Sequence, residues 1–220
     1  MAIKLKKDDS AQLGLQKFSV GLGWEVNPLP NEEFDLDVSA FMLTSSGKIP
    51  TDEYLVFYNS ETRLLADTNG NLKRPINIVP FTKWTDNDAM RKESRPTDPE
   101  ISVIGSIDNE IGGIGDSETL DIDLSKVRSD IERIIICVSI YEASDRNQNF
   151  GRVKDAYIRI YEQGKSQMGK EEIRYDLSED FSTSRSVEFV QLRRNGLNWN
   201  IEAMGLGHKG EFDELVGLYT

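Results

Sequence analysis

Short segments that alternate between apolar and polar residues cover most of this chain, and they constrain its fold more than any other feature. Strict alternation places every second side chain on the same face of an extended strand. Turn-forming residues separate the segments, and little helical periodicity is present, so the pattern predicts an all-β sandwich or barrel. The segments span residues 2–6, 18–24, 34–43, 53–59, 101–105, 118–124, 132–142, 155–162, 171–177, 186–194 and 197–205.

The pair Asn195–Gly196 separates the last two alternating segments. Both residue types tolerate positive φ, so we expect a hairpin with a type I′ turn at this pair. Residues 123–131 and 211–219 are the candidates for short helices.

Residues 60–100 differ from the rest of the chain. This region is polar, lacks sustained periodicity and contains four of the seven prolines. We expect one long loop insertion in a single domain that spans 1–220. Phe81 and Trp84 in this region could form a docking surface or could fix the loop to the sandwich.

Charge and hydropathy exclude several classes of function. The net charge is −12, so we expect no nucleic-acid partner, because the phosphate backbone requires a basic surface. No apolar stretch is long enough for a membrane span. The N-terminal residues MAIKLKKDD carry positive charge with no apolar segment behind them, which does not fit a signal peptide. We therefore expect a cytoplasmic protein.

Residues for enzymatic chemistry are scarce. His208 is the only histidine and Cys137 the only cysteine. Cys137 lies in the apolar segment RIIICVSIYEA, which predicts a buried, unreactive thiol. His208 is expected at the surface or in a turn. No phosphate-binding glycine motif is present: the glycines in VGLGW (20–24) and IGGIGD (111–116) do not lie between a strand and a helix.

Oxygen-rich segments remain as candidate binding residues. Asp35 and Asp37 alternate with apolar residues, so both project from one face of the expected strand, about 7 Å apart. The glycine-punctuated segment SIDNEIGGIGDSE (106–118) offers further carboxylates and amides. Calcium takes six to eight oxygen ligands in flexible geometry. The alternative is an ordinary solvated acidic surface.

Residues 121–132 resemble an EF-hand calcium loop, because acidic residues occupy its positions 1, 3 and 12. Position 6 of that loop must be glycine, and here it is Lys126. The preceding residues also alternate as a strand does, whereas an EF-hand begins with a helix. We reject an EF-hand.

Taken together, several motifs resemble the TerD family of tellurite-resistance and stress-response proteins. The resemblance covers nearly the whole chain except residues 60–100. It is carried, in chain order, by VGLGWE, FDLDVSAF, VFYN, GSIDN, GDSETLDIDLSKV, VSIYEA, QNFGRVKDAYIRIY, IRYDLSED and RRNGLNWNIEAMGLGHKG.

The resemblance implies an all-β, antiparallel β-sandwich with a few short helices, which binds Ca²⁺ through acidic loops at one end. Some relatives are described as cyclic-nucleotide binders. Ser117 replaces an acid of the family pattern, which puts one ligand, or one of two neighbouring ions, in doubt. The implied metal ligands in this chain are Asp35, Asp37, Asn59, Asp108, Asn109, Asp116 and Glu118.

These observations give a leading hypothesis and two alternatives. The leading one is a non-enzymatic calcium-binding protein that acts in chemical-stress resistance as a calcium-dependent interaction module, with other stress-response proteins as partners. One alternative is a metal-dependent hydrolase or a nucleotide-binding protein on the same fold. The other is an acidic interaction protein that binds no ion.

Overall fold

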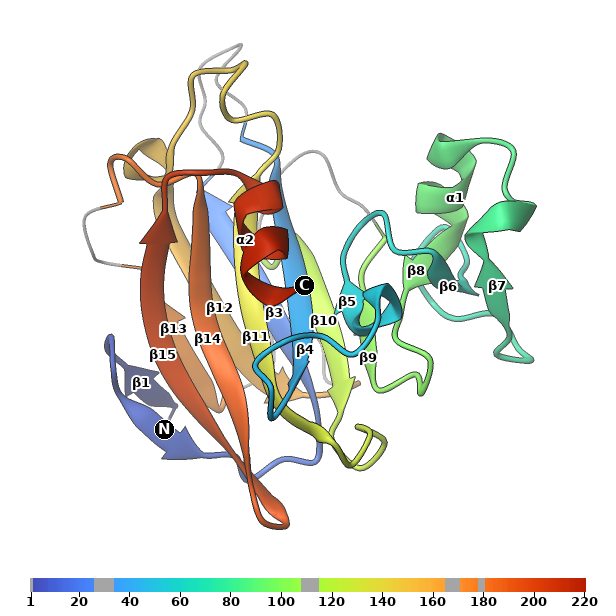
Figure 1. The fold of residues 1–220 in the computed structure, drawn as a ribbon, viewed down its shortest axis with the longest axis horizontal. Helices are drawn as coiled ribbons and strands as arrows, with labels where there is room; N and C mark the ends of the chain where they lie inside the picture. Colours follow the sequence, from blue (N-terminus) through green and yellow to red (C-terminus); the bar gives the residue numbers. More distant parts are fainter. Residues whose placement is uncertain (1, 26–33, 108–114, 165–170, 178–180) are drawn as a thin grey trace.

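Two six-stranded β-sheets stack face to face and form a sandwich, with a small third sheet beside it (Figure 1). The computed structural model describes residues 2–25, 34–107, 115–164, 171–177 and 181–220. The all-β fold predicted from the alternating segments is confirmed, and so is the sandwich that the TerD resemblance implies. All the strand pairs in the described residues are antiparallel except one, in which β1 runs parallel to β13.

The first sheet, sheet A, contains strands from both halves of the chain in the order β1-β13-β12-β3-β10-β9. The bounds in that order are Ile3–Leu5, Ile173–Asp176, Lys154–Glu162, Lys17–Glu25, Glu118–Asp123 and Val103–Gly105.

The second sheet, sheet B, has the order β2-β15-β14-β11-β4-β5. Its bounds in that order are Ser10–Gln12, Asn198–His208, Ser186–Asn195, Ile131–Ile140, Leu36–Thr44 and Leu55–Val56. A 3₁₀ turn, Asp52–Tyr54, precedes β5. A second 3₁₀ turn, Phe150–Arg152, precedes β12.

The inner faces of the two sheets form one continuous apolar core. On β3, Phe18, Val20 and Leu22 are at most 1% exposed. Ile158 and Ile160 of β12 show the same alternation. β12 alternates between buried and more exposed residues, as expected of a strand with one face on the core. β3 is buried on both faces from Phe18 to Trp24, and its outward-facing positions are the small residues Ser19, Gly21 and Gly23.

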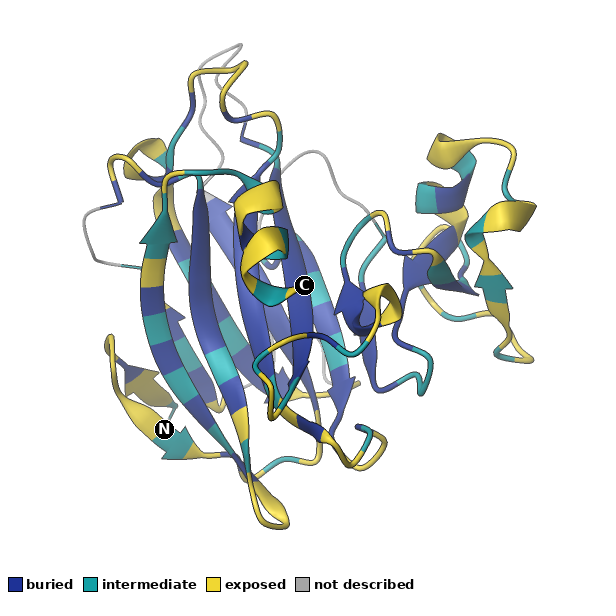
Figure 2. Ribbon diagram, viewed as in Figure 1, coloured by how far each residue is buried: buried dark blue, intermediate teal, exposed yellow. Residues whose placement is uncertain are grey.

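Strand β4 is buried on both faces (Figure 2). The outer face of β4 is covered by the C-terminal helix α2 (Phe212–Tyr219), which agrees with the helix expected at 211–219. The Phe41 ring lies 5.0 Å from that of Tyr219 and 6.1 Å from that of Phe212, measured between ring centroids. Leu215 of α2 is fully buried, and burial of a leucine side chain contributes roughly 2 kcal/mol. Apolar contact therefore holds the helix on the sheet.

Two local expectations differ from the structure. The hairpin between β14 and β15 is confirmed, but Asn195 pairs with Asn198, so the loop residues are Gly196 and Leu197. Of these two, Gly196 alone has positive φ, at 61°, which is what a type II′ turn requires. The helix expected at 123–131 is wrong: these residues form turns after β10.

The interpretation of residues 60–100 as a long loop is also wrong. This region contains a three-stranded sheet, sheet C, and a helix (Figure 1). The elements are β6 (Thr62–Leu65), β7 (Ile78–Pro80), a 3₁₀ turn (Phe81–Lys83), α1 (Asn87–Glu93) and β8 (Ser94–Pro96). Strands of three or four residues are too short to show alternation, so the sequence pattern did not reveal them.

Two arginines organise sheet C and its attachment. Arg63 is fully buried and donates to the Tyr58 carbonyl (2.7 Å) and the Ser94 hydroxyl (2.6 Å). Arg95 reaches the sandwich, donating to the Gly105 carbonyl of β9 (2.6 Å) and the Asp121 carboxylate of β10 (2.8 Å). Phe81 and Trp84 are half-buried, and the indole nitrogen of Trp84 is fully buried, which favours a packing role for Trp84.

We predict that the sandwich folds without residues 70–93. Leu65 and Ser94 are direct partners on neighbouring antiparallel strands, so a short Gly-containing turn can join β6 to β8. Replacement of 70–93 by such a turn should preserve the β-type circular dichroism spectrum and a single cooperative melting transition. Loss of cooperative unfolding would show instead that the sandwich depends on α1 and β7.

Candidate metal centre

The strand directions bring the two predicted acidic segments to the same end of the sandwich. Asp37 is opposite Ser139, near the end of β11. Glu118 is opposite Leu22, near the end of β3. A hydrogen bond of 2.6 Å from the Val38 amide to Glu118 Oε2 joins the two segments directly. Asp108 and Asn109 lie outside the described residues.

Asp37 lies on the outer face of β4, beside the first turn of α2. It is only 6% exposed and borders a hollow of about 170 Å³. Three more acidic residues line this hollow: Glu142 after β11, and Glu211 and Asp213 at the start of α2. We call this feature the Asp37 hollow. Its other polar lining groups are hydroxyls, those of Ser139, Tyr58 and Tyr141.

Polar residues continue from Asp37 across sheet B. The register places Asp37, Ser139, Ser186 and His208 in one row. The neighbouring row contains Ser39, Cys137 and Glu188. Rows of this kind are unusual beneath a packed helix, where buried polar groups require hydrogen-bond partners.

Two members of these rows have a buried oxygen that makes no hydrogen bond within the described residues, the Ser39 hydroxyl and Glu188 Oε2. His208 was expected at the surface, but its side chain is only 13% exposed and its Nε2 lies 2.8 Å from Glu188 Oε1. Cys137 is buried as predicted, and burial raises the pKa of its thiol.

Glu118 has a structural role in the described conformation. It is 4% exposed, and its carboxylate accepts the Val38 amide at the edge of β4, beyond the point where β5 pairs with that strand. An unpaired backbone amide at a buried strand edge is costly, so this contact stabilises the junction of the two sheets.

Asp116 is held by an arginine of sheet A. Its carboxylate receives two hydrogen bonds from Arg159 on β12, Nε to Oδ1 at 2.7 Å and a terminal nitrogen to Oδ2 at 3.0 Å. Burial raises the pKa of the Asp116 carboxyl, and the Arg159 contacts offset that effect only in part. Burial alone would lower the pKa of Arg159, but the Asp116 carboxylate outweighs it and the pKa is raised.

The glycines of VGLGW make room for these side chains. A Cβ at Gly21 would clash with the Asp116 carboxylate, and a Cβ at Gly23 would clash with the Tyr157 ring. Any larger residue at Gly21 would displace the buried Asp116 carboxylate. The motif therefore serves close packing over β3.

The remaining predicted ligands lie around this end of the molecule with different exposure. Asp35 precedes β4, is half-buried, and its carbonyl accepts the Tyr141 amide at 2.9 Å. Asn59 is exposed in the turn after β5. Glu118 therefore lies next to Val38, the residue that follows Asp37. Asp116 lies over β3 of the other sheet.

The chemistry of the Asp37 hollow fits an oxygen-ligated cation, because its polar side chains are carboxylates and hydroxyls. The geometry is not that of a preformed site: within the described ranges, no three acidic, histidine or cysteine side chains are close enough to hold one ion. An ion at Asp37 would also need carbonyl or water ligands.

Sequence reasoning missed Glu142, Glu211 and Asp213. The signal was present, since Glu211, Asp213 and Glu214 cluster in four residues at the start of a predicted helix. What the sequence does not show is that this helix packs over β4.

Comparison with known proteins assigns the sandwich to a family. The TerD domain profile matches residues 1–69 and 94–219. The chain belongs to the TerD family. The segment that the family profile leaves unmatched, residues 70–93, contains β7 and α1.

TerD-family relatives match over almost their whole length. The tellurium resistance protein TerD of Serratia marcescens is 32% identical, covering 100% of this chain and 97% of the relative. General stress protein 16U of Bacillus subtilis is 33% identical, covering 96% and 93% respectively. This chain is therefore a tellurium-resistance and general-stress type of protein.

Solved structures agree with the fold. A crystal structure described as a homologue of telluride resistance protein (TerD), from Streptomyces coelicolor, superposes with a TM-score of 0.58. It is 16% identical and the match covers 92% of this chain and 96% of that one. Among the helices of the described residues, none is long and apolar enough to span a membrane.

We predict that Asp116→Asn lowers the free energy of unfolding by about 3 kcal/mol, because it leaves the Arg159 guanidinium buried without its counter-charge. The side chains of Asp116 and Arg159 are 0% and 12% exposed. The measurement is denaturant unfolding followed by tryptophan fluorescence.

A matched control is Asp176→Asn, which removes the same charge from the ion pair with Arg174. The side chain of Asp176 is 52% exposed, so its loss should change stability by less than about 1 kcal/mol. Equal effects of the two substitutions would contradict a structural role for the Asp116–Arg159 pair.

Proposed function

We propose that this TerD-family protein is a calcium-binding, non-enzymatic interaction module that acts in the cytoplasm during chemical stress, with other stress-response proteins as its partners. The observation that carries the proposal is the burial of Asp37, whose carboxylate borders a hollow that three further acidic residues line. Four carboxylates border one small volume, and a divalent cation bound beside Asp37 would offset part of their negative charge.

The ligands we propose first are Asp35 and Asp37. Asp35 directly precedes β4 and Asp37 is its second residue, and burial of both faces of β4 fixes the position of the strand. Asn59, Asp108 and Asn109 stay in the proposed ligand set on the family pattern. Glu142, Glu211 and Asp213 are added to it as outer carboxylates of the Asp37 hollow.

Asp116 and Glu118 are weaker candidates. In the described conformation Asp116 is bound by Arg159 and Glu118 by the Val38 amide. Direct coordination of a cation by Asp116 would compete with two charge-assisted hydrogen bonds. We therefore propose that both residues shape the acidic end of the sandwich, and that the ion binds nearer to Asp37.

Calcium bound at Asp37 would connect distant parts of the chain. It would link the start of β4 to the start of α2, two segments that lie far apart in the sequence. The ordered acidic surface would then be available to a protein partner only when the ion is bound. This arrangement makes partner binding depend on calcium without any catalytic step.

We predict that calcium raises the melting temperature of the wild-type protein relative to chelator. At a calcium concentration roughly 100 times Kd, the rise should be about 5 to 10 °C, because the ion binds the folded state alone. Asp37→Asn should remove most of this shift, while Asp116→Asn should melt lower in both conditions and keep it. Differential scanning fluorimetry measures these shifts.

The control variant is Asp52→Asn, which removes the same charge from an exposed 3₁₀ turn. It should keep the full calcium shift. A wild-type melting temperature that does not respond to calcium would refute the proposal. So would an equal loss of the shift in Asp52→Asn, which would indicate general charge screening.

A further inference from the structure

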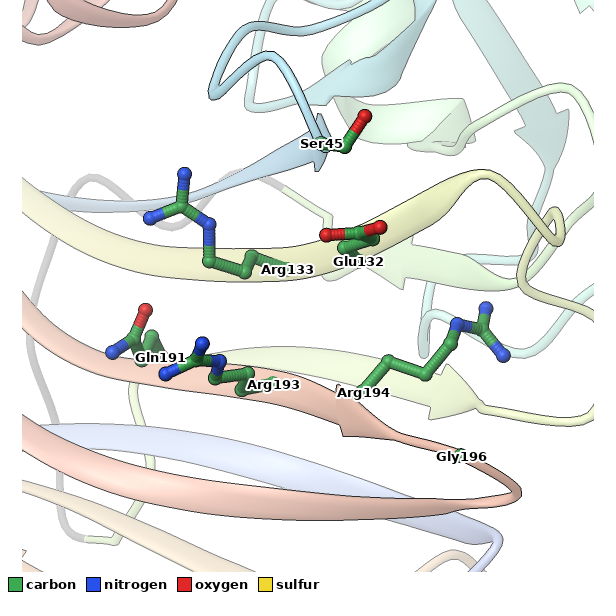
Figure 3. A pocket seen from close by; sticks show the side chains of 7 residues that line it. All are labelled: Ser45, Glu132, Arg133, Gln191, Arg193, Arg194 and Gly196. Carbon is green, nitrogen blue, oxygen red and sulfur yellow. The ribbon is translucent and has the colours of Figure 1, made fainter.

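A second hollow, of about 500 Å³, lies on the outer face of sheet B near the β14–β15 hairpin, and arginines line much of it (Figure 3). We call it the arginine hollow. It is formed by side chains of β11 and β14 together with Ser45 after β4. Glu132 is the one acidic residue among those that line it.

Arg133 of β11 and Arg193 of β14 stand directly opposite each other in the sheet. Like charges at opposed positions of an antiparallel pair repel each other. The chain has 38 acidic residues and 26 basic ones, so carboxylates to separate these arginines are abundant. Yet within the described residues neither guanidinium takes part in an ion pair or a hydrogen bond.

Arg194, the third arginine of the hollow, differs from Arg133 and Arg193 because its guanidinium is held by other groups of the protein. Arg194 donates to the carbonyls of Ile131 (2.8 Å) and Arg128 (3.0 Å), and its guanidinium lies 4.5 Å from the centre of the Trp199 ring. Figure 3 shows it directed away from Arg133 and Arg193. Hydrogen bonds and ring packing therefore account for Arg194, whereas no ion pair or hydrogen bond of this kind holds Arg133 or Arg193 among the described residues.

The neighbours of Arg133 and Arg193 are suited to a polar ligand. Gln191 precedes Arg193 by two residues on the same face, and its amide donates to Glu202 at 2.6 Å. This bond fixes the position of the Gln191 amide. Ser45 is exposed and adds a hydroxyl on the opposite side of the hollow.

We propose that the arginine hollow binds a small dianionic phosphomonoester, with Arg133 and Arg193 as the residues that bind its phosphate. A guanidinium offers paired donors that match phosphate oxygens, and two of them balance two negative charges. The hollow is within the size range of small-molecule sites and larger than a phosphate ion requires. The remaining volume, beside Gln191 and Ser45, accommodates the organic part of the ligand.

This site is separate from the proposed calcium site. Arg133 and Ser139, the strand neighbour of Asp37, are six residues apart on β11, which corresponds to about 20 Å. Binding at the arginine hollow is therefore expected with or without calcium, and the two proposals can fail independently.

The test is isothermal titration calorimetry on the full chain, with inorganic phosphate and glycerol phosphate as probes and chloride at matched ionic strength. We expect saturable binding of glycerol phosphate that is tighter than that of inorganic phosphate. Arg133→Gln and Arg193→Gln should each weaken it by about tenfold or more, because each removes a charge-assisted hydrogen bond. Arg193 is exposed, so its substitution leaves the core intact.

The control is Arg185→Gln, which removes the same charge from a half-buried position at the other end of sheet B. Its affinity for glycerol phosphate should equal that of the wild type. The proposal would be overturned if glycerol phosphate showed no saturable binding with a Kd below about 10 mM, which corresponds to a binding free energy of roughly −3 kcal/mol. An equal loss in Arg185→Gln would overturn it too, by showing that the overall charge is responsible. Equal affinity for both probes would assign the site to free phosphate and refute the phosphomonoester.

Discussion

Burial of β4 on both faces is the constraint on which the rest of this structure depends. Its inner face completes the core of the sandwich, and its outer face holds α2 through Phe41. Asp37 belongs to the outer face, so the packing of the helix is what removes a carboxylate from solvent. The same packing brings Glu211 and Asp213 toward it. The acidic end of the molecule is thus a consequence of how its centre is packed.

Much of the sandwich could be predicted, because large apolar side chains alternate with smaller or polar ones along several of its long strands. β3, β12 and β15 show the alternation that such strands impose on a sequence. Sheet C could not be predicted in this way. Its strands have at most four residues, and its centre is a buried arginine bonded to carbonyls and a hydroxyl, which hydropathy patterns do not register.

The sequence predicted where the acidic residues of the candidate site lie better than it predicted what each of them contacts. The TerD resemblance implied that the acidic segments lie at one end of the sandwich, and there Glu118 accepts a hydrogen bond from the amide of Val38, the residue after Asp37. The partner of Asp116 was beyond reach, since Arg159 is 43 residues away and nothing local marks the pair. Gly21 was the available signal: a strand glycine indicates that another group approaches closely. Here that group is the Asp116 carboxylate.

The N-terminal strands have a consequence for how the chain reaches this fold. β1 pairs with residues 173–175 and β2 with residues 200–202, so each joins its sheet through contacts that span most of the sequence. Such pairings raise the contact order, which slows folding. During synthesis β1 and β2 have no strand to pair with until residues 173–175 and 200–202 have left the ribosome. The exposed edges of β13 and β15 are therefore covered last, and the nascent protein is open to edge-to-edge association until its N-terminus returns.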